Sequence, residues 1–365
     1  MSTVVTQANE QLREAILAAL GEAVAAGELP GEPIPAFVIE IPADRSHGDL
    51  AANVAMVSAR AFRQSPRKIA ETIAAHLNLA GTFLERAEVA GPGFLNFFLA
   101  PSFYAAAVAD VLAKGADYGR SDYGQGKKVL VEFVSANPTG PMHIGNARGG
   151  AIGDCLAAVL ERAGYQVSRE FYINDAGNQI NKFGMSLELR YLQLYRDGVE
   201  MPEDSYHGQD IVEHAFAAIH GDRYVDASEE ERRQALVDYA LPLNVAGLER
   251  DLATYRIHYD CWFRESTLHE NGEAAKVVEL LTARGYTYES EGAVWFKATD
   301  FGADKDFVLR RSNGFFTYVV PDIAYHYNKL VTRGYDKAID VLGADHHGYV
   351  PRLKAALQAL GVDPA

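Results

Sequence analysis

The sequence predicts an α/β protein whose larger domain is a Rossmann-like parallel sheet with a helical or α+β insertion, preceded by a small α+β domain. The main observation is an apolar strand at residues 128–134, followed by a Pro- and Gly-rich loop, a helix, and a second strand at residues 167–173. This order is a βαβ unit, which requires a parallel sheet. The glycine- and aspartate-rich run GADYGRSDYGQG, residues 115–126, is typical of a linker and places the domain boundary there.

Composition narrows the class of protein. With 48% hydrophobic and 23% charged residues, the 365-residue chain has globular composition. It has no apolar run of the roughly 20 residues that cross a bilayer, and its N-terminus lacks signal-peptide features, so a cytoplasmic protein without a membrane partner is expected. Its two cysteines show no metal-site or disulfide spacing. The net charge of −15 argues against non-specific nucleic-acid binding and suits a cationic substrate, although local basic patches stay possible.

The first domain is expected at residues 1–114. Apolar residues at helical spacing indicate its first helix, namely Leu12, Ile16, Leu20 and Val24. Ser65 and Pro66 are typical of an N-cap and the first position of a helix. The aromatic run at residues 94–99 predicts a strand, and a helix is expected at residues 101–114.

The second domain is expected at residues 127–365. The helix after its first strand is predicted to present one apolar face, formed by Ile152, Leu156, Val159, Leu160 and Ala163. The strand signal fades between residues 175 and 298, which predicts an insertion that contains a capping box at Ser228. The sheet is then expected to resume with a hairpin, residues 307–310 and 315–320, and with a strand at residues 338–342.

The loop SANPTGPMHIGN, residues 135–146, lies after the first strand of this sheet. Open α/β sheets bind ligands at this edge, and a helix start offers free N–H groups and partial positive charge to phosphate. His143 and Asn146 are three residues apart, so both can flank one polyphosphate, and Gly145 permits close approach. The alternative is a loop whose histidine only caps the helix. The loop is neither a Walker loop nor a GxGxxG motif.

Residues 132–154, EFVSANPTGPMHIGNARGGAIGD, resemble the first signature of class I aminoacyl-tRNA synthetases, and most closely that of arginine–tRNA ligases. Asn146 stands where the family's His-Ile-Gly-His motif has its last histidine. Further segments resemble the same family in order along nearly the whole chain: HGDLAANVAM (47–56), PGFLNFFLA (92–100), YINDAGNQ (172–179), DCWFRES (260–266), DFVLRRSNG (306–314), TYVVPDIAYH (317–326) and VLGADHHGYVPRLKAAL (341–357).

The resemblance implies an enzyme that activates L-arginine with ATP and transfers it to tRNA(Arg) in protein biosynthesis. Mg²⁺ would accompany ATP through phosphate oxygens, without a dedicated protein metal site. The first domain would contact the tRNA elbow. The family's second ATP signature, a Lys-Met-Ser-Lys type loop, and its anticodon-binding domain are absent from this sequence, so a truncated monomer with weak or no aminoacylation is expected.

The matching positions imply where the substrates bind. The catalytic residues would be His143 and Asn146. ATP would contact Pro138, His143, Gly145, Asn146, His346 and His347. Arginine would contact Glu132, Ser135, Asn137, Tyr318, Asp322 and His346. His326 is expected only to pack in a helix.

Three of these assignments have alternatives. A guanidinium needs a carboxylate and further acceptors, and Tyr318 and Asp322 are four residues apart, yet Asp322 could only begin a helix. Glu132 lies in an apolar strand and needs a cation, either the substrate or an internal ion pair. The cluster Asp345-His346-His347 could suggest a metal, but its spacing is not that of a zinc site, and none is predicted.

Two other functions stay open. Another nucleotidyl transferase of the same fold would share the histidine loop, but the pair Tyr318 and Asp322 and the first domain argue against it. A non-catalytic RNA-binding or regulatory fragment is the second alternative, and the acidic balance argues against a stand-alone RNA binder.

Overall fold

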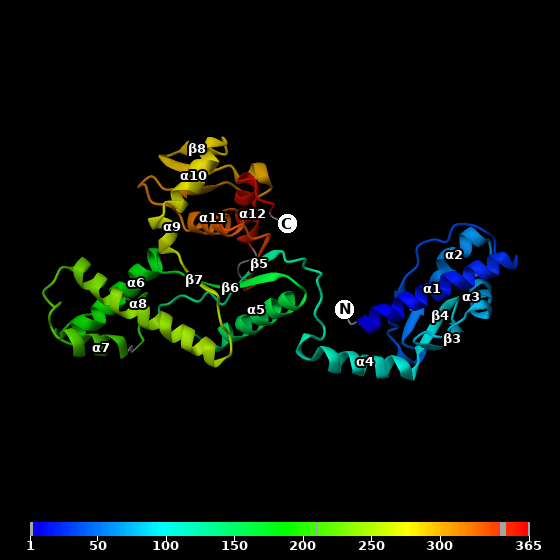
Figure 1. The fold of residues 1–365 in the computed structure, drawn as a ribbon. Coiled ribbons are helices and arrows are strands. Elements are labelled where there is room, and N and C mark those ends of the chain that lie inside the picture. Colours follow the sequence, from blue (N-terminus) through cyan, green and yellow to red (C-terminus); the bar gives the residue numbers. More distant parts are fainter. Residues whose placement is uncertain (1–2, 209–210, 344–347, 364–365) are drawn as a thin grey trace. The chain divides into compact units, whose positions relative to one another are not determined.

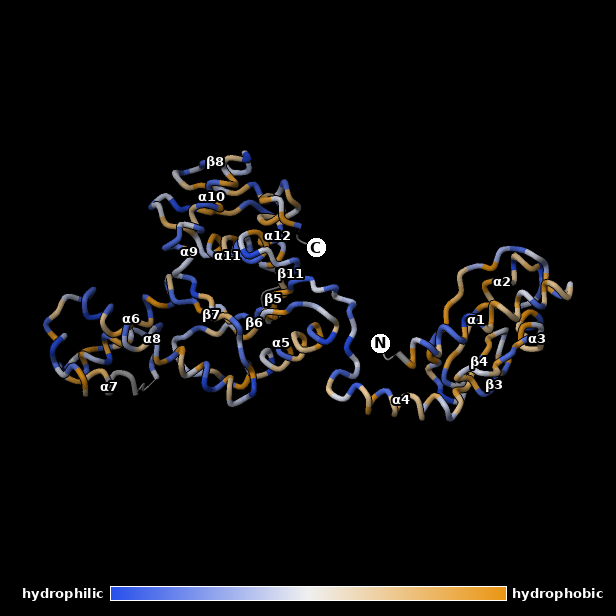
Figure 2. Tube along the Cα trace, viewed as in Figure 1, coloured by the Kyte–Doolittle hydropathy of each residue, from blue (hydrophilic) through white to orange (hydrophobic). Residues whose placement is uncertain are grey.

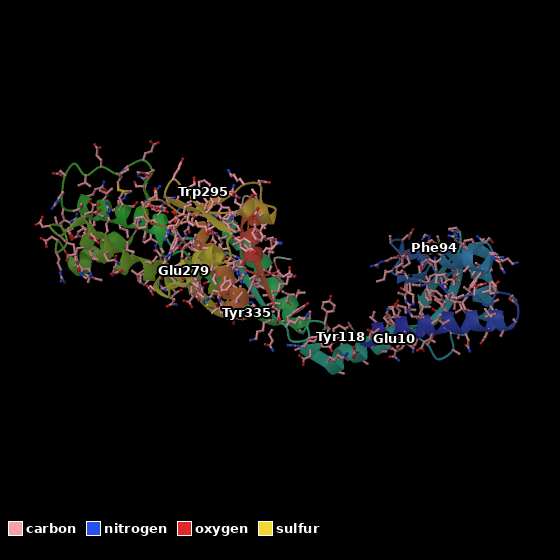
Figure 3. All side chains as sticks on the ribbon, turned by 90° about the horizontal axis from the view of Figure 1, so that it is seen from above. Glu10, Phe94, Tyr118, Glu279, Trp295 and Tyr335 are labelled. Atoms are coloured by element: carbon pink, nitrogen blue, oxygen red, sulfur yellow. The ribbon has the colours of Figure 1, made fainter. Side chains whose placement is uncertain are left out.

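The computed structural model describes residues 3–208, 211–343 and 348–363, with the side chains of residues 3 and 211–215 excluded. The chain forms two compact units, Met1–Ser121 and Asp122–Ala365 (Figure 1). The division falls within the glycine-rich residues 115–126. Figure 3 shows the side chains of both units, with Phe94 in the first and Trp295 and Tyr335 in the second.

The first unit is an antiparallel sheet of order β1-β2-β4-β3, packed with helices. Leu12, Ile16 and Leu20 of its first helix are fully buried, as their spacing predicts. Ser65 caps the third helix by accepting from Lys68 N, and Pro66 is its first residue, as predicted. The elements are α1 (Thr3–Ala25), β1 (Ile39–Glu40), a 3₁₀ turn (Arg45–His47), β2 (Leu50–Ala52), α2 (Val54–Phe62), α3 (Pro66–His76), β3 (Leu84–Ala90), β4 (Phe94–Leu99), α4 (Pro101–Lys114) and a 3₁₀ turn (Gly115–Asp117).

Helix α4 differs from the other helices of this unit because none of its residues is buried. It is largely apolar (Figure 2), and Val108 and Leu112 are 59% and 77% exposed. The predicted bounds of this helix and of the strand before it are confirmed.

The second unit contains a four-stranded parallel sheet of order β11-β5-β6-β7, the Rossmann-like sheet that the sequence predicts. The chain runs outward from β5 through β6 to β7 and then returns to β11 on the other side of β5. Strands β5 and β11 therefore flank the topological switch point, where such sheets bind ligands. The sheet strands are β5 (Lys128–Phe133), β6 (Gln166–Ile173), β7 (Cys261–Arg264) and β11 (Lys337–Val341).

Helices and a small antiparallel sheet of order β10-β9-β8 complete this unit. Ser228 caps its longest helix by accepting from Glu231 N, as predicted. No helix in the described ranges is long and apolar enough to span a membrane. The elements are α5 (Ile144–Arg162), α6 (Gly177–Gln193), α7 (Ile211–His220), α8 (Glu229–Thr254), α9 (Ser266–Glu270), α10 (Glu273–Ala283), β8 (Thr287–Ser290), β9 (Ala293–Phe296), a 3₁₀ turn (Ala298–Phe301), β10 (Phe307–Arg310), α11 (Val319–Tyr327), a π-helical turn (Asn328–Thr332) and α12 (Val350–Ala359).

Two expectations about strands were wrong. Residues 261–264 lie inside the expected insertion, yet as β7 they pair with β6 in the parallel sheet. The expected second hairpin strand, residues 315–320, makes only a single bridge, between Arg310 and Phe316, and Val319 already begins α11. The Val-Val pair fits a strand pattern, but burial of Val319 and Val320 against the helices outweighs that local preference.

The buried face of α5 also differs from the prediction. Gly150, Gly153 and Ala157 are its buried residues, whereas Ile152 and Val159 are 54% and 65% exposed. A Cβ at Gly153 would lie 2.1 Å from Phe133 Cγ, so the helix approaches β5 too closely for a larger residue. Close backbone packing, which apolar periodicity does not reveal, decides the face of this helix.

Candidate functional site

A cavity of about 390 Å³ extends along β11, from Asp336 before the strand to Leu342 after it, and reaches Glu132 near the carboxyl end of β5. Its polar lining comes from elements far apart in the sequence, because the return of the chain to β11 brings α11 and α12 beside β5. The lining residues that the site uses are Glu132, Tyr172, Asp322, His326, Asp340 and Tyr349. Three of the lining carboxylates, Glu132, Asp322 and Asp340, therefore lie near the switch point of the sheet, and Asp336 and Asp363 also line the cavity.

Asp322 lies in the first turn of α11, and its Oδ2 accepts from Tyr349 Oη at 2.5 Å. Burial raises the pKa of Asp322 to about 6, although the bond from Tyr349 and the nearby His326 act in the opposite direction. The charges of Glu265 and Glu132 raise this pKa further. An ionised Asp322 is thus costly unless a cation enters the cavity.

Glu265 is a second carboxylate near Asp322, and the residue-level sequence assignments missed it. Its side chain is 12% exposed, and Oε2 accepts from Tyr172 Oη at 2.8 Å. Burial raises the pKa of Glu265 despite the bonds from Tyr172 and His269. The sequence feature that could have identified it is the position of Glu265 in the DCWFRES segment, directly after the residues that form the strand Cys261–Arg264.

Glu132 and Asp340 are direct neighbours on the parallel strands β5 and β11. The fully buried Lys329 lies between them, with Nζ 2.5 Å from Glu132 Oε2 and 2.8 Å from Asp340 Oδ1. Burial alone would lower the pKa of Lys329, but the two carboxylates outweigh it and raise that pKa. The structure therefore contains the internal ion pair that was the alternative for Glu132, and this pair accounts for the buried carboxylate without a substrate.

Asp340 receives a second bond, from His326, whose Nε2 lies 2.5 Å from Asp340 Oδ2. Burial alone would raise the pKa of Asp340, but Lys329 and His326 together hold that pKa well below its usual range. His326 Nδ1 lies 2.8 Å from the backbone oxygen of Asp322. His326 thus links α11 to β11 at the cavity, a role beyond the packing that its sequence position suggests.

His143 caps α5, because its Nδ1 accepts from Gly145 N at 3.1 Å while Asn146 Oδ1 accepts from His143 N at 3.1 Å. The histidine therefore caps the helix, as the alternative reading of this loop expected. The same contacts also determine which ring nitrogen carries the proton when the ring is neutral. With Nδ1 accepting, a neutral ring carries its proton on Nε2, which is then a donor without net charge. The His143 side chain is exposed, and a Cβ at Gly145 would lie 2.8 Å from its Cε1.

The remaining predicted residues lie at different places around the cavity and the loop. Ser135 lies beside the cavity, where Oγ donates to Glu132 Oε1 at 2.8 Å. Asn137 is exposed, whereas Pro138 is buried and its backbone oxygen accepts from Asn244 Nδ2 of α8. Tyr318 is 68% exposed, with its ring centroid 5.8 Å from that of Tyr349. His346 and His347, with Asp345, lie outside the described residues.

Known proteins resemble this chain along its length. The model of the arginyl-tRNA synthetase N-terminal domain matches residues 10–99, and the class I tRNA synthetase (R) catalytic-domain model matches residues 107–207. The Arginine--tRNA ligase of Caldanaerobacter subterraneus subsp. tengcongensis is 57% identical over 366 residues. That match covers 100% of this chain, which spans 65% of the length of the relative.

Two solved structures share the fold. A Campylobacter jejuni chain described as a candidate arginyl-tRNA synthetase aligns with a TM-score of 0.67 and 36% identity, covering 73% of this chain and 58% of that one. Arginyl-tRNA synthetase from Thermus thermophilus aligns with a TM-score of 0.62 and 24% identity, covering 96% and 62%. The α/β architecture with its parallel sheet and preceding small domain is therefore a known one.

Proposed function

Because this chain belongs to the arginine–tRNA ligase family, we propose that it activates L-arginine with ATP and passes the arginine to tRNA(Arg). The arginine carboxylate attacks the α-phosphorus of ATP, and pyrophosphate leaves. A terminal ribose hydroxyl of tRNA then attacks the arginyl carbonyl, and AMP leaves. No protein nucleophile takes part, so positioning and charge stabilisation supply the catalysis.

The pair Asp322 and Glu265 is the observation that carries this proposal. Burial raises the pKa of both carboxyl groups. Among the described residues, neither forms an ion pair with a lysine or arginine, and the ion-pair partner of Glu265 is His269, whose Nε2 lies 3.6 Å from Glu265 Oε1. A guanidinium offers a delocalised positive charge and several donors, which two nearby carboxylates can accept.

Lys329 limits the number of carboxylates that a cationic ligand can neutralise. It already compensates Glu132 and Asp340. Asp322, in the cavity lining, and Glu265, which contacts the lining residue Tyr172, are then the two carboxylates that we assign to the ligand, and Tyr349 and Tyr172 orient them through hydrogen bonds. Tyr318 borders this place through its neighbour Tyr349. We therefore place the arginine side chain between Asp322, Glu265 and Tyr318.

The ATP phosphates would bind at the start of α5. His143 Nε2–H, the Asn146 amide group and the free N–H groups of the first helical turn are suitable donors for them. Mg²⁺ would enter with ATP on its phosphate oxygens. The described residues contain no group of three or more His, Cys, Asp or Glu that could hold a metal, and we assign no step to one.

The matched family models support roles for the two parts of the chain. We assign tRNA contact to residues 1–114 and arginine activation to residues 127–365. We further propose that the protein is a cytoplasmic monomer. Since the chain spans 65% of the length of its relatives, the complete reaction stays a proposal.

The test is the substitution Asp322→Asn, which keeps size and removes charge. Arginine affinity should fall by about 2–5 kcal/mol, the cost when a buried charge pair loses one partner. ATP affinity should stay the same. Calorimetric titration measures the affinities for L-arginine, for its neutral analogue citrulline, and for ATP. The variant should lose the preference for arginine over citrulline.

The matched control is Asp306→Asn, since Asp306 accepts from Thr299 N and Oγ1 in a turn outside the cavity lining. It should leave arginine affinity unchanged. An Asp322→Asn variant that binds arginine normally would show that Asp322 only begins α11. Arginine-dependent ATP–pyrophosphate exchange, with and without tRNA, separates a ligase from another nucleotidyl transferase or an RNA-binding fragment.

A further inference from the structure

Two consecutive residues directly after β5 adopt left-handed backbone conformations. Val134 has φ +68° and Ser135 has φ +42°. Ser135 N donates to Phe133 O at 3.0 Å, which closes a three-residue γ-turn centred on Val134. A γ-turn with positive central φ is rare and strained, and a β-branched residue rarely adopts this conformation.

Such strain persists only where the surroundings over-determine it. Phe133 O accepts a second bond, from Tyr259 Oη at 2.9 Å. The Tyr259 ring is packed between Phe133 and Phe171, with ring centroids 4.6 and 5.4 Å away. Tyr259 comes from the connection between α8 and β7, so a separate part of the chain holds the first carbonyl of the turn.

The other end of the turn is held through the Ser135 side chain. Its Oγ donates to Glu132 Oε1 at 2.8 Å and accepts from Tyr172 N at 3.1 Å. Lys329 holds the second oxygen of Glu132 in a fully buried ion pair. The buried network of the cavity thus continues directly into the strained turn.

We propose that Tyr259 is a positioning residue, whose hydroxyl group holds the γ-turn at Val134 in the conformation that directs residues 135–146 toward arginine and ATP. The proposal rests on the proposed function for the identity of these ligands. Without the hydroxyl group, Phe133 O keeps its bond from Ser135 N, so no carbonyl is left unpaired. The turn, however, loses a bond that opposes relaxation of Val134 to a negative φ.

The test compares Tyr259→Phe with the matched control Tyr191→Phe. Tyr191 is fully buried where Tyr259 is half-buried, and its hydroxyl also donates to a backbone carbonyl, Gly221 O at 2.6 Å, in the helical part of the same unit. Each variant therefore loses one hydroxyl-to-carbonyl bond and keeps its ring, and Tyr191→Phe also loses the bond that Tyr191 Oη accepts from Tyr224 N at 3.4 Å. Backbone hydrogen exchange over residues 134–146 and calorimetric affinities for L-arginine and ATP are measured for both variants and the unchanged chain.

Tyr259→Phe should speed exchange across residues 134–146 and weaken binding of L-arginine and ATP about fivefold, the typical effect of one neutral hydrogen bond. Tyr191→Phe should change neither. Unchanged exchange in Tyr259→Phe, or equal effects in both variants, would overturn the positioning role. If the unchanged chain bound neither ligand, the proposed function would fail, while exchange over residues 134–146 would still decide the role of Tyr259.

Discussion

At the scale of single residues, Asp322 determines how pH should affect arginine binding. Its pKa is raised from an ordinary value of 3.8 to about 6, mainly by burial, and Glu265 and Glu132 contribute while Tyr349 and His326 oppose. The guanidinium keeps its charge at all relevant pH values and binds the ionised carboxylate. Binding is therefore fully favoured above pH 6 and is lost as pH falls through this pKa.

We expect arginine affinity to decrease up to about tenfold for each pH unit below 6, because protonation competes with the ligand. Calorimetric titrations between pH 5 and 8 measure this slope. In Asp322→Asn, the residual affinity should depend much less on pH, with Glu265 as the remaining contributor. A flat profile for the unchanged chain would exclude Asp322 as the guanidinium partner.

The raised pKa of Asp322 affects folding stability in the opposite direction to arginine binding: stability decreases as pH rises, whereas arginine affinity increases. Because the folded-state pKa of Asp322 exceeds its ordinary value, the folded protein binds the extra proton between about pH 4 and 6. Its contribution to the free energy of unfolding therefore decreases as pH rises through this range. Asp322 is thus a residue kept at a cost in stability, which is typical of functional sites.

The two ring nitrogens of His143 have different proposed roles, one in capping α5 and the other in phosphate binding. Its Nδ1 caps α5, whereas only Nε2 can donate outward. His143→Asn should retain the cap, since asparagine is among the best N-cap residues, but lose the outward donor. His143→Ala should lose both, with a decrease of about 1 kcal/mol in the free energy of unfolding. We expect both variants to bind ATP less tightly, as measured by calorimetry. Normal ATP binding by His143→Asn would leave capping as the only role of His143.

Individual residue types could be predicted where the chemistry is local. The loop with His143 and Asn146 stands out by its position after the first strand, whereas Asp322 was selected through the resemblance to the family, and the roles of all three stay predictions. The partner of Glu132 could not be predicted, because Lys329 lies 197 residues later and resembles any solvent-facing lysine of a helix. Glu265 lies in the DCWFRES segment, but its place near Asp322 could not be predicted, because it depends on the pairing of β7 with β6.

At the scale of elements, α5 shows that glycine residues, rather than the stripe of large apolar residues, can determine which face of a helix is buried. Gly153 faces Phe133, and a Cβ there would lie 2.1 Å from Phe133 Cγ. Gly149, one turn earlier, has nothing within 4 Å of its ideal Cβ. Gly153 and Gly149, two of the four glycines of α5, therefore provide a matched pair for substitution.

We expect Gly153→Ala to destabilise the second unit by about 1–3 kcal/mol, the usual cost of overpacking. Gly149→Ala should instead stabilise it by roughly 0.5–1 kcal/mol, because alanine has the higher helix propensity. Urea unfolding followed by circular dichroism measures both. Equal behaviour of the two variants would mean that α5 can move away from β5 at little cost.

The elements that the sequence could predict are those with a local signal. The strand at β4, the cap and proline of α3, and the βαβ unit of β5, α5 and β6 follow from spacing and turn residues. Strand β7 could not be predicted, because its four residues pair only with a distant strand. The start of α11 was also missed, since Val319 and Val320 suit a strand until tertiary packing is known.

At the scale of the whole molecule, each unit has its own apolar core. One cluster includes Leu12, Ile16 and Phe97 of the first unit, whereas separate clusters fill the second. The chain between residues 115 and 126 contains the division between them. We therefore expect two separable unfolding transitions in calorimetry.

Limited proteolysis provides the corresponding functional prediction. Cleavage between residues 115 and 126 should leave two folded fragments, and the fragment from Asp122 should bind arginine with unchanged affinity, because every residue of the cavity belongs to it. Calorimetric titration of the purified fragment measures this. A loss of arginine affinity on cleavage would mean that the first unit supports the cavity.

The ion pair between Glu132 and Lys329 also determines the order in which the protein can form during synthesis. The ribosome adds about 5–20 residues per second. The 197 residues between the two partners therefore delay Lys329 by roughly 10–40 s after Glu132. Throughout this interval burial of β5 would leave Glu132 without its lysine partner, and β11, its later neighbour, does not yet exist. We therefore expect the first unit, which ends at Ser121, to fold before the parallel sheet, whose burial becomes favourable once Lys329 has been added.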